Sequence, residues 1–273
     1  MTLRTLSDKN ARVVRLGKLS ARRRARDAEA AFVIDGPVLL ADALTSGVTV
    51  TDVFVDAERL DERTADALDA AEAAGAEVYA VSPDVLRRAT DPVHPQAVAA
   101  IAMRPVVPAG TLAGARSVLA LVGVADPGNA GTLVRSAVAA GFDAVVVTPG
   151  TVELLGPKAL RASAGALFAV PVVEVDSVET LVATLRDASI TTVATTLDAE
   201  VDLDAVDLTG PCAVLVGNEA HGLDAELTAM ADVRVRIPMA GPVESLNAAM
   251  AGTLVCFEVL RQRRAAGVEV ATR

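Results

Sequence analysis

Three short loops carry the polar side chains that could hold and orient a substrate, and each loop follows an apolar stretch. Asn129 lies in the first loop and Arg135 six residues later, Glu219 lies in the second, and Ser245 and Asn247 lie in the third. Polar side chains beside a helix N-terminus, with its unpaired N–H donors and positive dipole end, suit an anionic or polar ligand. The three loops are therefore candidates for one site that binds a polar ligand.

Each of these side chains also has a simpler interpretation. Asn129 could cap the helix that follows it, and Ser245 could cap the last helix of the chain. Glu219 could be a carboxylate at a helix start, where the helix dipole favours negative charge. Arg135 could be a surface side chain with its stem on apolar neighbours. The residues alone leave these alternatives open.

The usual nucleotide-binding and hydrolase fingerprints do not occur in the loops. The first loop reads Gly123-Val-Ala-Asp-Pro-Gly-Asn-Ala-Gly, which is neither G-x-G-x-x-G nor the Gly-Lys-Ser/Thr of a P-loop. The sequence has no Gly-x-Ser-x-Gly elbow, and His94 and His221 lie apart from any nucleophile. These observations disfavour a dehydrogenase, a P-loop NTPase and a serine hydrolase, and the sequence predicts no metal site.

The loops belong to a C-terminal region that is predicted to form a parallel α/β sheet. Apolar runs predict strands, and the segments between them predict helices that cover both faces. Ligands of open α/β sheets bind beyond the carboxyl ends of the strands, where these loops lie. The expected strands are 118–124, 144–147, 170–175, 191–195, 212–216 and 233–237, and the expected helices are 132–140, 157–167, 178–188 and about 245–264.

The N-terminal half predicts a second, smaller α/β unit over residues 27–105. Strands and helices alternate in a compact βαβα pattern. Pro105, Pro108 and Gly110 then interrupt the pattern, which predicts a linker over about 105–115 and a C-terminal domain over 115–273. The expected strands of the first unit are 31–34, 50–55, 77–81 and 97–103, and its expected helices are 36–46, 58–74 and 83–89.

Charge is distributed unevenly along the chain. Residues 1–26 hold nine basic side chains and one acidic one, whereas the whole chain carries a formal charge of −10. This concentration favours a basic N-terminal arm that neutralises phosphates, densest at Arg22, Arg23 and Arg24, although a solvated basic helix would look the same. Aromatic residues make up 2% of the chain, so little surface is available for stacking bases.

Other sequence features predict a cytoplasmic protein. No apolar run reaches the ~18 residues of a membrane span, and the N-terminus lacks the apolar core of a signal peptide. Cys212 and Cys256 both lie in apolar runs, which is typical of buried thiols in an intracellular protein.

The three loops resemble the three motifs of the SpoU (TrmH-type) RNA ribose 2′-O-methyltransferases. The matching stretches are Asp126-Pro-Gly-Asn-Ala-Gly-Thr-Leu-Val-Arg-Ser-Ala, Leu215-Val-Gly-Asn-Glu-Ala-His-Gly-Leu and Ile237-Pro-Met-Ala-Gly-Pro-Val-Glu-Ser-Leu-Asn. Between the first two lies Arg161-Ala-Ser-Ala-Gly-Ala, which is also similar to the family. Phe32-Val-Ile-Asp-Gly-Pro and Val93-His-Pro-Gln-Ala-Val-Ala-Ala resemble the family's small RNA-binding substrate domain, except that Ala97 stands where many relatives have glycine.

The resemblance implies a fold, a cofactor and an assembly. It implies that the C-terminal α/β domain holds a deep trefoil knot, that S-adenosylmethionine is the methyl donor, and that two copies form a homodimer through their knotted domains. The last helix has an apolar stripe that would suit such a dimer or the core equally well. The stripe consists of Leu246, Met250, Leu254, Phe257 and Leu260.

The resemblance also implies roles for particular residues. Arg135 would take the proton or, with less chemical difficulty, orient the ribose; Asn129 would hold Arg135, and Glu219, Ser245 and Asn247 would position the substrate. The cofactor would be held at Thr196, Leu197, Gly217, Asn218, Ile237, Met239 and Leu246. The RNA would be bound by Arg22, Arg23, Arg24, Lys158 and Arg161, although the last two could equally be solvated helix positions.

The identity of the substrate is left open by the sequence. Ribosomal RNA is favoured over transfer RNA because of the two-domain layout. A non-catalytic knotted protein that binds RNA or assists ribosome assembly, and a small-molecule methyltransferase, are the alternatives. The complete set of candidate catalytic residues disfavours the first alternative, and the basic N-terminus disfavours the second.

Overall fold

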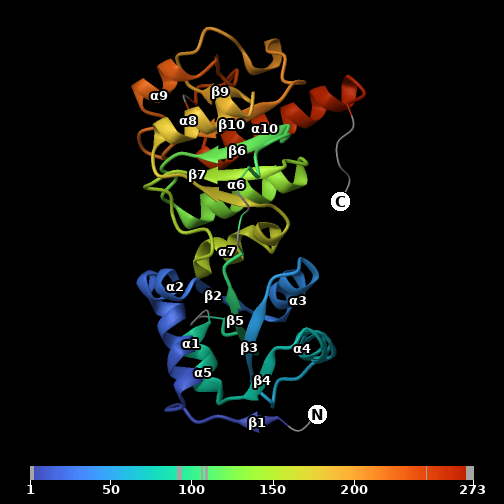
Figure 1. Cartoon of the computed structure of the whole chain (residues 1–273). Coiled ribbons are helices and arrows are strands. Elements are labelled where there is room, and N and C mark those ends of the chain that lie inside the picture. Colours follow the sequence, from blue (N-terminus) through green and yellow to red (C-terminus); the bar gives the residue numbers. More distant parts are fainter. Residues whose placement is uncertain (1–2, 91–93, 106, 108–109, 244, 269–273) are drawn as a thin grey trace. The chain divides into compact units, whose positions relative to one another are not determined.

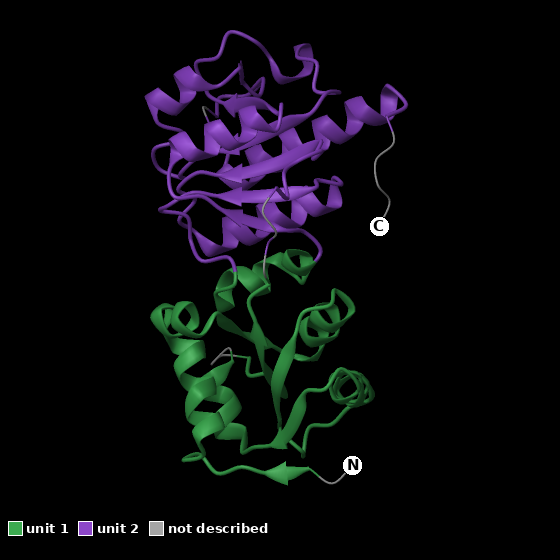
Figure 2. Ribbon diagram, viewed as in Figure 1, with its two compact units in different colours: residues 1–106, 155–168 green, residues 107–154, 169–273 purple. Residues whose placement is uncertain are grey.

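The protein folds into two compact units, which Figure 2 colours separately. The structure, a computed structural model, describes residues 3–90, 94–105, 107, 110–243 and 245–268. Unit 1 comprises residues 1–106 and 155–168, and unit 2 comprises residues 107–154 and 169–273. Val93, Pro108 and Glu244, which belong to stretches discussed above, lie outside the described residues.

Unit 1 is built on a mixed sheet with strand order β1-β4-β3-β5-β2 over the residues that are described. Strands β1, β4 and β3 run parallel, whereas β5 is antiparallel to both of its neighbours, β3 and β2. Val33 of β2 lies opposite Ile101 of β5. The strands are β1 (Arg4–Thr5), β2 (Ala31–Asp35), β3 (Val50–Val55), β4 (Glu77–Ala80) and β5 (Val98–Met103).

Helices cover both faces of this sheet. In Figure 1, α1 and α5 lie on one side of the strands, and α3 and α4 lie on the other. Leu16 and Leu19 of α1 pack with Phe54 and Leu86 in the core between α1, α5 and the sheet. The helices of unit 1 are α1 (Ala11–Ala21), α2 (Arg23–Glu29), α3 (Pro37–Thr45), α4 (Glu62–Ala73), α5 (Pro83–Ala89) and α7 (Pro157–Ser163), the last followed by a 3-10 turn (Ala166–Phe168).

The basic N-terminus is part of unit 1 and not a separate arm, which corrects the expected boundary at residue 26. Helix α1 is amphipathic and buries its apolar face, as above. Arg12 and Arg15 form ion pairs with Asp52, whose side chain is 3% exposed. Arg26 is itself buried and donates a hydrogen bond to the Leu19 carbonyl at 2.6 Å. Part of the positive charge that suggested an arm therefore stabilises the fold.

The segment 155–168 was expected in the C-terminal domain but groups with unit 1. Arg161 of α7 donates to the Asp35 carboxylate at 3.0 Å, and the Asp35 side chain is 4% exposed. The Phe168 and Phe32 rings lie 6.2 Å apart between centroids. Arg161 and Asp35 both come from stretches that resembled the family, so part of the sequence signal of these stretches reflects packing.

Unit 2 contains a sheet of parallel strands, as predicted. Among the described residues the strand order is β11-β9-β10-β6-β7-β8, and every pair of neighbours is parallel. The central strands β6 and β10 are buried throughout, which explains their continuous apolar runs. The strands are β6 (Ser117–Leu121), β7 (Ala144–Val147), β8 (Val172–Glu174), β9 (Thr191–Thr195), β10 (Cys212–Val216) and β11 (Val233–Val235).

Two pairs of helices cover the sheet of unit 2. Leu181 and Leu185 of α8 and Leu227 of α9 share a core with β6, β7 and β10 on one face. Helix α10 packs against α6 and β10, and a Cβ at Gly252 of α10 would approach the Leu133 side chain to 2.3 Å. The helices are α6 (Pro127–Ala139), α8 (Val178–Asp187), α9 (Ala225–Met230) and α10 (Ala248–Ala265). No helix within the described ranges is both long and apolar enough to cross a membrane.

A buried arginine fixes the end of α10 to the sheet. Arg263 is 5% exposed and donates to the carbonyl oxygens of Arg116 and Gly210, both at 2.7 Å, and to the Ser117 hydroxyl at 2.5 Å. Removal of the side chain would leave these acceptors without their donor in a site that excludes water. Burial also lowers the pKa of Arg263 from its usual value.

We expect Arg263→Met to lower the free energy of unfolding by about 3 kcal/mol, since buried groups hydrogen-bonded to a charge are costly to leave unsatisfied. Urea denaturation followed by circular dichroism measures the change. Arg261→Met is the matched control, because Arg261 is exposed on the same helix and forms its ion pair with Glu258 at the surface. If both variants unfold at the wild-type midpoint, the buried arginine does not hold α10 in place.

Candidate active site

Glu219 joins the loop after β10 to the loop after β6. Its Oε2 accepts the backbone N–H of Ala125 at 3.0 Å, and its Oε1 accepts the backbone N–H of Asp126 at 3.0 Å. The same Oε1 also accepts the Asn129 side-chain amide at 3.0 Å. One carboxylate thus fixes both the backbone and a side chain of the first loop, which is more than the helix-start role that its position alone suggested.

Asn129 connects this pair of loops to the third. The Asn247 amide donates to Asn129 Oδ1 at 3.1 Å, so Glu219, Asn129 and Asn247 form one chain of hydrogen bonds. Asn247 also caps α10, because its Oδ1 accepts the backbone N–H groups of Ala249 and Met250 at 2.9 and 3.3 Å. The structure therefore brings together three of the five candidate catalytic residues.

Both helix caps differ from the expected ones. Helix α6 starts at Pro127, five residues earlier than predicted, and its cap is Asp126, which accepts the Asn129 N–H at 2.8 Å. Asn129 therefore lies within the first turn, with its side chain available for Glu219 and Asn247. At the third loop the cap is Asn247 and not Ser245, which is exposed. An Asp directly before a Pro is a helix-start signal that the sequence already contained.

Arg135 lies on α6 and is exposed. Within the described residues it has no hydrogen-bond or ion-pair partner, and Ser245 likewise has none. Asn129 uses its amide for Glu219 and its oxygen for Asn247, and no hydrogen bond joins it to Arg135 among the described residues, so its role in holding Arg135 stays a prediction. The Arg135 guanidinium is free to contact a substrate.

Glu219 remains ionised at neutral pH. Partial burial raises the pKa of its carboxyl group, but hydrogen bonds from the Asn129 amide and from the N–H groups of Ala125 and Asp126 outweigh burial. The pKa of Glu219 consequently lies below its usual value. A carboxylate that accepts three hydrogen bonds acts as a clamp and not as a general acid.

Asn218 makes a second cross-link between the same two loops. Its side-chain amide donates to the Gly123 carbonyl at 2.9 Å, and its Oδ1 accepts the Ala220 N–H at 2.9 Å. Gly123 has a φ of +66°, and its N–H donates to the buried Thr151 hydroxyl at 3.1 Å. Sequence reasoning missed the contribution of Thr151, because nothing near it indicates chemistry.

Backbone packing explains Gly217, which was expected at the cofactor. A Cβ at this position would lie 2.3 Å from the carbonyl carbon of Gly222, so no other residue fits without a shift of the loop. Glycine at 217 therefore allows the second loop to fold back on itself.

The remaining candidate cofactor residues lie in the chain segments that follow β9 and β11. The Thr196 N–H donates to the Val235 carbonyl at 2.9 Å, so the chain leaving β9 runs beside β11. Leu197, Met239 and Leu246 expose 72%, 38% and 38% of their surface. The Thr196 hydroxyl is shielded from solvent and has no hydrogen-bond partner among the described residues. Apolar surface and an unsatisfied hydroxyl suit a ligand with both apolar and polar parts.

The candidate RNA-binding residues behave differently from one another. Arg22, Arg23 and Arg24 are exposed at the junction of α1 and α2, and Arg23 forms a 3.6 Å ion pair with Asp27. Lys158 of α7 is exposed. Arg161 shares α7 with Lys158 but is occupied by the buried Asp35 carboxylate, as described above. Arg22, Arg24 and Lys158 are therefore better placed to contact phosphates than Arg161.

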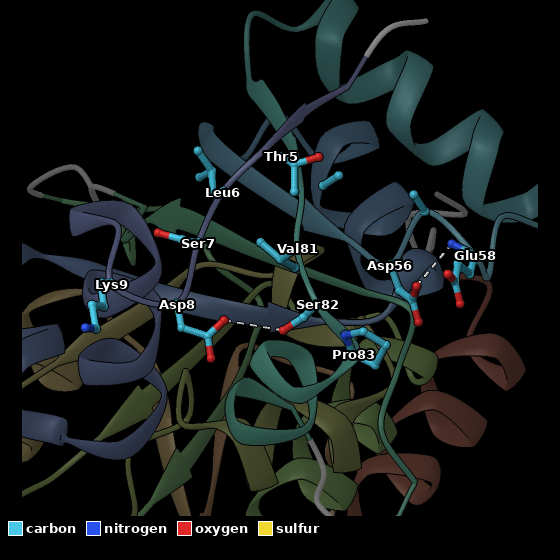
Figure 3. A pocket seen from close by; sticks show the side chains of 12 residues that line it. Thr5, Leu6, Ser7, Asp8, Lys9, Asp56, Glu58, Val81, Ser82 and Pro83 are labelled. Atoms are coloured by element: carbon cyan, nitrogen blue, oxygen red, sulfur yellow. Dashed lines mark hydrogen bonds between the residues drawn. The ribbon is translucent and has the colours of Figure 1, made fainter.

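A pocket of about 600 Å³ opens at the carboxyl ends of β1, β3 and β4 in unit 1, and Figure 3 shows its lining. Asp8, Asp56 and Glu58 contribute negative charge to it. Lys9 contributes positive charge, and Arg88 donates to the Asp8 carboxylate at 2.7 Å. Acidic side chains outnumber basic ones in this lining, which disfavours the binding of phosphates there. In the part of the chain that the structure describes, no group of three metal-ligating side chains occurs.

Comparison with known proteins identifies the family. The profile of the SpoU rRNA methylase family matches residues 116–257, more than half of the chain. The chain belongs to the SpoU rRNA methylase family. A second profile, the MRM3-like substrate binding domain, matches residues 10–100, which include α1.

Two relatives of this SpoU protein match it over most of their length. The 23S rRNA (guanosine(2553)-2′-O)-methyltransferase RlmP of Bacillus subtilis (strain 168) is 33% identical over 84% of this chain and 88% of its own. The 23S rRNA (uridine(2479)-2′-O)-methyltransferase of Streptomyces viridochromogenes is 32% identical over 95% of this chain and 93% of its own.

A solved structure supports the same relationship. The SpoU methyltransferase AviRb from Streptomyces viridochromogenes, in complex with AdoMet, superposes with a TM-score of 0.83 at 30% identity, over 94% of this chain and 99% of that one. This SpoU protein is an RNA ribose methyltransferase, and its cofactor is S-adenosylmethionine.

Proposed function

We propose that this SpoU protein transfers a methyl group from S-adenosylmethionine to the 2′-hydroxyl of one ribose in 23S ribosomal RNA. The observation that carries the proposal is the hydrogen-bonded chain of Glu219, Asn129 and Asn247, which joins three loops at the carboxyl edge of the sheet. Support for ribosomal RNA comes from the two 23S-specific relatives, whose similarity extends through unit 1 as well as unit 2. Modification of ribosomal RNA would take place in the cytoplasm.

The chemistry requires alignment of the ribose hydroxyl with the methyl group and stabilisation of the developing alkoxide. S-adenosylmethionine supplies the electrophilic methyl group when it is bound. Arg135 would orient the ribose through its free guanidinium and stabilise negative charge on the 2′-oxygen. A guanidinium is too basic to serve readily as a proton acceptor, so orientation is the role that its chemistry favours.

The network residues would keep the reacting edge rigid. Glu219 holds the start of α6, and Asn247 holds the start of α10, so the two helix N-termini are fixed relative to each other. Ser245, two residues before the α10 cap, would contact the RNA directly. Preorganisation of this kind lowers the barrier because the groups need not rearrange during the reaction.

The cofactor would lie against the chain segments that leave β9, β10 and β11. The residues that would hold it are Thr196, Leu197, Gly217, Asn218, Ile237, Met239 and Leu246. The exposed apolar side chains among them offer surface for the apolar faces of the cofactor. Asn218 would act by shaping the second loop, since its own amide is bonded to Gly123.

We further propose that the C-terminal segment forms the trefoil knot of the family. Strand β11 is at the outer edge of the sheet beside β9, whereas the following helix α10 packs against α6 and β10 nearer the centre. The chain therefore crosses from the edge back to the middle of the sheet after β11. Family membership supports the view that this crossing passes through a loop of the same chain.

A homodimer would cover the apolar stripe on α10. Met250, Leu254 and Phe257 expose 58%, 46% and 45% of their surface, and Leu246 exposes 38%. The opposite face of the helix packs into the core, so the exposed row is available for a partner. The buried residues are Ala249, Gly252, Val255, Cys256, Val259 and Arg263. An exposed apolar row of this kind is typical of an interaction surface.

Leu254→Glu is expected to convert the dimer into a monomer, because a carboxylate would be buried without a partner at the interface. Sedimentation velocity measures the mass at a protein concentration of about 10 µM. This concentration is well above the dissociation constant of a stable dimer, which is expected to be ~1 µM or lower. Arg264→Glu changes charge on the same helix outside the stripe and should leave the mass unchanged. A wild-type protein that sediments as a monomer would contradict the dimer.

The substrate is tested by a map of 2′-O-methylated riboses in total RNA from cells with and without the gene. We expect one position in 23S ribosomal RNA to lose its modification when the gene is absent. A loss in transfer RNA would overturn the ribosomal assignment, and an unchanged map would favour a non-catalytic role.

A further inference from the structure

The pocket of unit 1 contains a buried carboxylate with one unused oxygen. Asp56 follows β3 directly, and it is 3% exposed. Its Oδ1 accepts the backbone N–H of Glu58 at 3.1 Å and so fixes the turn that leaves the strand, as Figure 3 shows. Its Oδ2 has no hydrogen-bond or ion-pair partner within the described residues. The turn therefore uses only part of the acceptor capacity of this carboxylate, whose side chain lines the pocket.

The basic side chains around the pocket leave the Asp56 carboxylate without a counter-charge. Arg88 is paired within the pocket lining, as described above, and Arg59 donates to the Pro95 carbonyl at 3.0 Å. Lys9 and Asp56 lie at opposite sides of the pocket in Figure 3, and Lys9 forms no ion pair in the part of the chain that is described. Charges that are removed from water are normally paired. The site therefore suits a cation that comes from another molecule.

The walls of the pocket suit a long side chain with a positive end. Leu6, Val81 and Pro83 provide apolar surface, and the exposed Glu58 adds a second carboxylate. A lysine can bury its methylene groups on such walls while its ammonium group meets the carboxylates. Arginine suits the site less well, because a guanidinium binds a carboxylate best through two parallel hydrogen bonds and Asp56 offers one unused oxygen.

An acidic strip continues from the pocket along α4, which begins at Glu62 after a short loop from Asp56. Arg63 is the one basic residue in the sequence of this helix. The acidic residues are exposed and recur every three or four positions, so they lie on one side of the helix. This strip, which would attract a chain of positive charges and repel RNA, consists of Glu62, Asp66, Asp69 and Glu72.

The pocket lies at the opposite end of α1 from the arginines that are proposed to bind RNA. Lys9, in the pocket lining, precedes the start of α1, whereas Arg22, Arg23 and Arg24 follow its end. A helix of 11 residues spans about 16 Å. A ligand in the pocket would therefore leave these arginines accessible to RNA.

We propose that the pocket and the acidic strip bind a lysine-rich segment of a protein partner. Asp56 and Glu58 hold the ammonium group of one lysine, the apolar walls cover its methylene groups, and the strip attracts the remaining positive charges of the segment. The inference goes beyond the function proposed above, since the site takes no part in the transfer of the methyl group.

Asp56→Asn tests the proposal by removing the charge while it keeps the turn. Asparagine retains an oxygen that can accept the Glu58 N–H, and it is favourable in such turns. Fluorescence anisotropy with fluorescein-labelled hexalysine should give a Kd about tenfold higher than that of the wild type, as for the loss of one charge-assisted hydrogen bond. The melting temperature should stay the same or rise, because a buried unpaired charge is removed.

Two further variants separate the pocket from net charge. Asp187→Asn removes an exposed carboxylate from α8 of unit 2 and should leave the Kd for hexalysine unchanged. Lys9→Met removes the positive charge from the pocket lining and should lower the Kd about threefold, the effect of one exposed charge. Hexaarginine carries the same charge as hexalysine, and Asp56→Asn should weaken its binding less.

Three results would overturn the inference. Equal Kd values of Asp56→Asn and Asp187→Asn for hexalysine would mean that net charge alone holds the peptide. An equal loss of hexaarginine and hexalysine binding in Asp56→Asn would remove the preference for lysine. A weaker affinity of Asp56→Asn for transcribed 23S ribosomal RNA would mean that the pocket belongs to the RNA-binding surface and not to a protein partner.

Discussion

Arg135→Ala is expected to lower the rate of methyl transfer to RNA on the order of 10²–10³-fold, the usual cost of removing one group that stabilises developing negative charge. The Kd for S-adenosylmethionine should remain within about twofold of the wild type, since a 1.4 kcal/mol contact would change it tenfold. The reason is geometric, because Arg135 is exposed on α6 and has no partner among the described residues that its loss would disturb. Single-turnover methylation of transcribed RNA measures the rate, and isothermal titration measures the Kd.

Two further variants sharpen this result. Arg135→Lys keeps the charge but loses the planar fork, so it should recover only part of the activity. Arg186→Ala removes an exposed arginine from α8, on the opposite face of the sheet, and should methylate RNA at the wild-type rate. Full activity of Arg135→Ala would remove this residue from the reaction.

Glu219→Gln should also reduce methyl transfer, on the order of 10²-fold, because misplacement of an aligned group by about 1 Å has that cost. Glu219 accepts hydrogen bonds from two backbone N–H groups and from the Asn129 amide. A glutamine would point its own N–H₂ group toward at least one of these three N–H donors. Because two donors cannot form a hydrogen bond, the first loop and the side chain of residue 219 would move apart. Single-turnover rates measure the loss, and cofactor binding should persist.

The pH dependence of stability tests the same clamp. The pKa of Glu219 is lower in the folded protein than its usual value. The stability that the carboxylate contributes is therefore present above the usual pKa of glutamate, about 4.3, and is lost as the pH falls through the folded-state pKa. The difference in urea midpoint between wild type and Glu219→Gln should shrink as the pH falls from neutrality into that range.

Glu226→Gln is the control for this pair of measurements. Glu226 is an exposed carboxylate on α9, in the same unit as Glu219. Its replacement changes the net charge equally but disturbs no loop contact of the active site. If Glu219→Gln and Glu226→Gln behave alike in activity and in pH dependence, Glu219 is not a clamp.

The sequence predicted the sheet of unit 2 well for a physical reason. Strands β6 and β10 are buried on both faces, so they must be apolar throughout, and such runs are visible without a structure. Helix α9 was missed because only Leu227 of its six residues is buried, which leaves no helical period to detect. The sequence predicts the type of an element when buried residues recur at a regular spacing. It does not do so when a single side chain buries a short helix.

Charge proved less informative than apolar pattern. The N-terminal basic residues predicted an arm, but a count of charges does not show whether each has a partner. Arg12 and Arg15 meet Asp52, which lies 37 to 40 residues away in the sequence, and only the folded sheet brings them together. The same is true of Arg161 and Asp35, which are 126 residues apart.

The candidate site was predicted in its residue types but not in its connections. Asn129, Glu219 and Asn247 were each identified, yet the chain of bonds between them depends on where α6 and α10 begin. Helix starts are set by caps, and here Asp126 and Asn247 provide them in place of Asn129 and Ser245. The unsatisfied Thr196 hydroxyl leaves no trace in the sequence, because threonine at a strand end is common.

The position of the transferred methyl group within the nucleotide tests the central claim most directly. Transcribed 23S ribosomal RNA is incubated with the protein and S-adenosylmethionine labelled in the methyl group, and the RNA is then hydrolysed completely with alkali. A 2′-O-methyl group blocks cleavage at its own nucleotide, so the label should appear in alkali-stable dinucleotides, and Arg135→Ala should give none. Label in mononucleotides would show methylation of a base and would contradict transfer to the ribose.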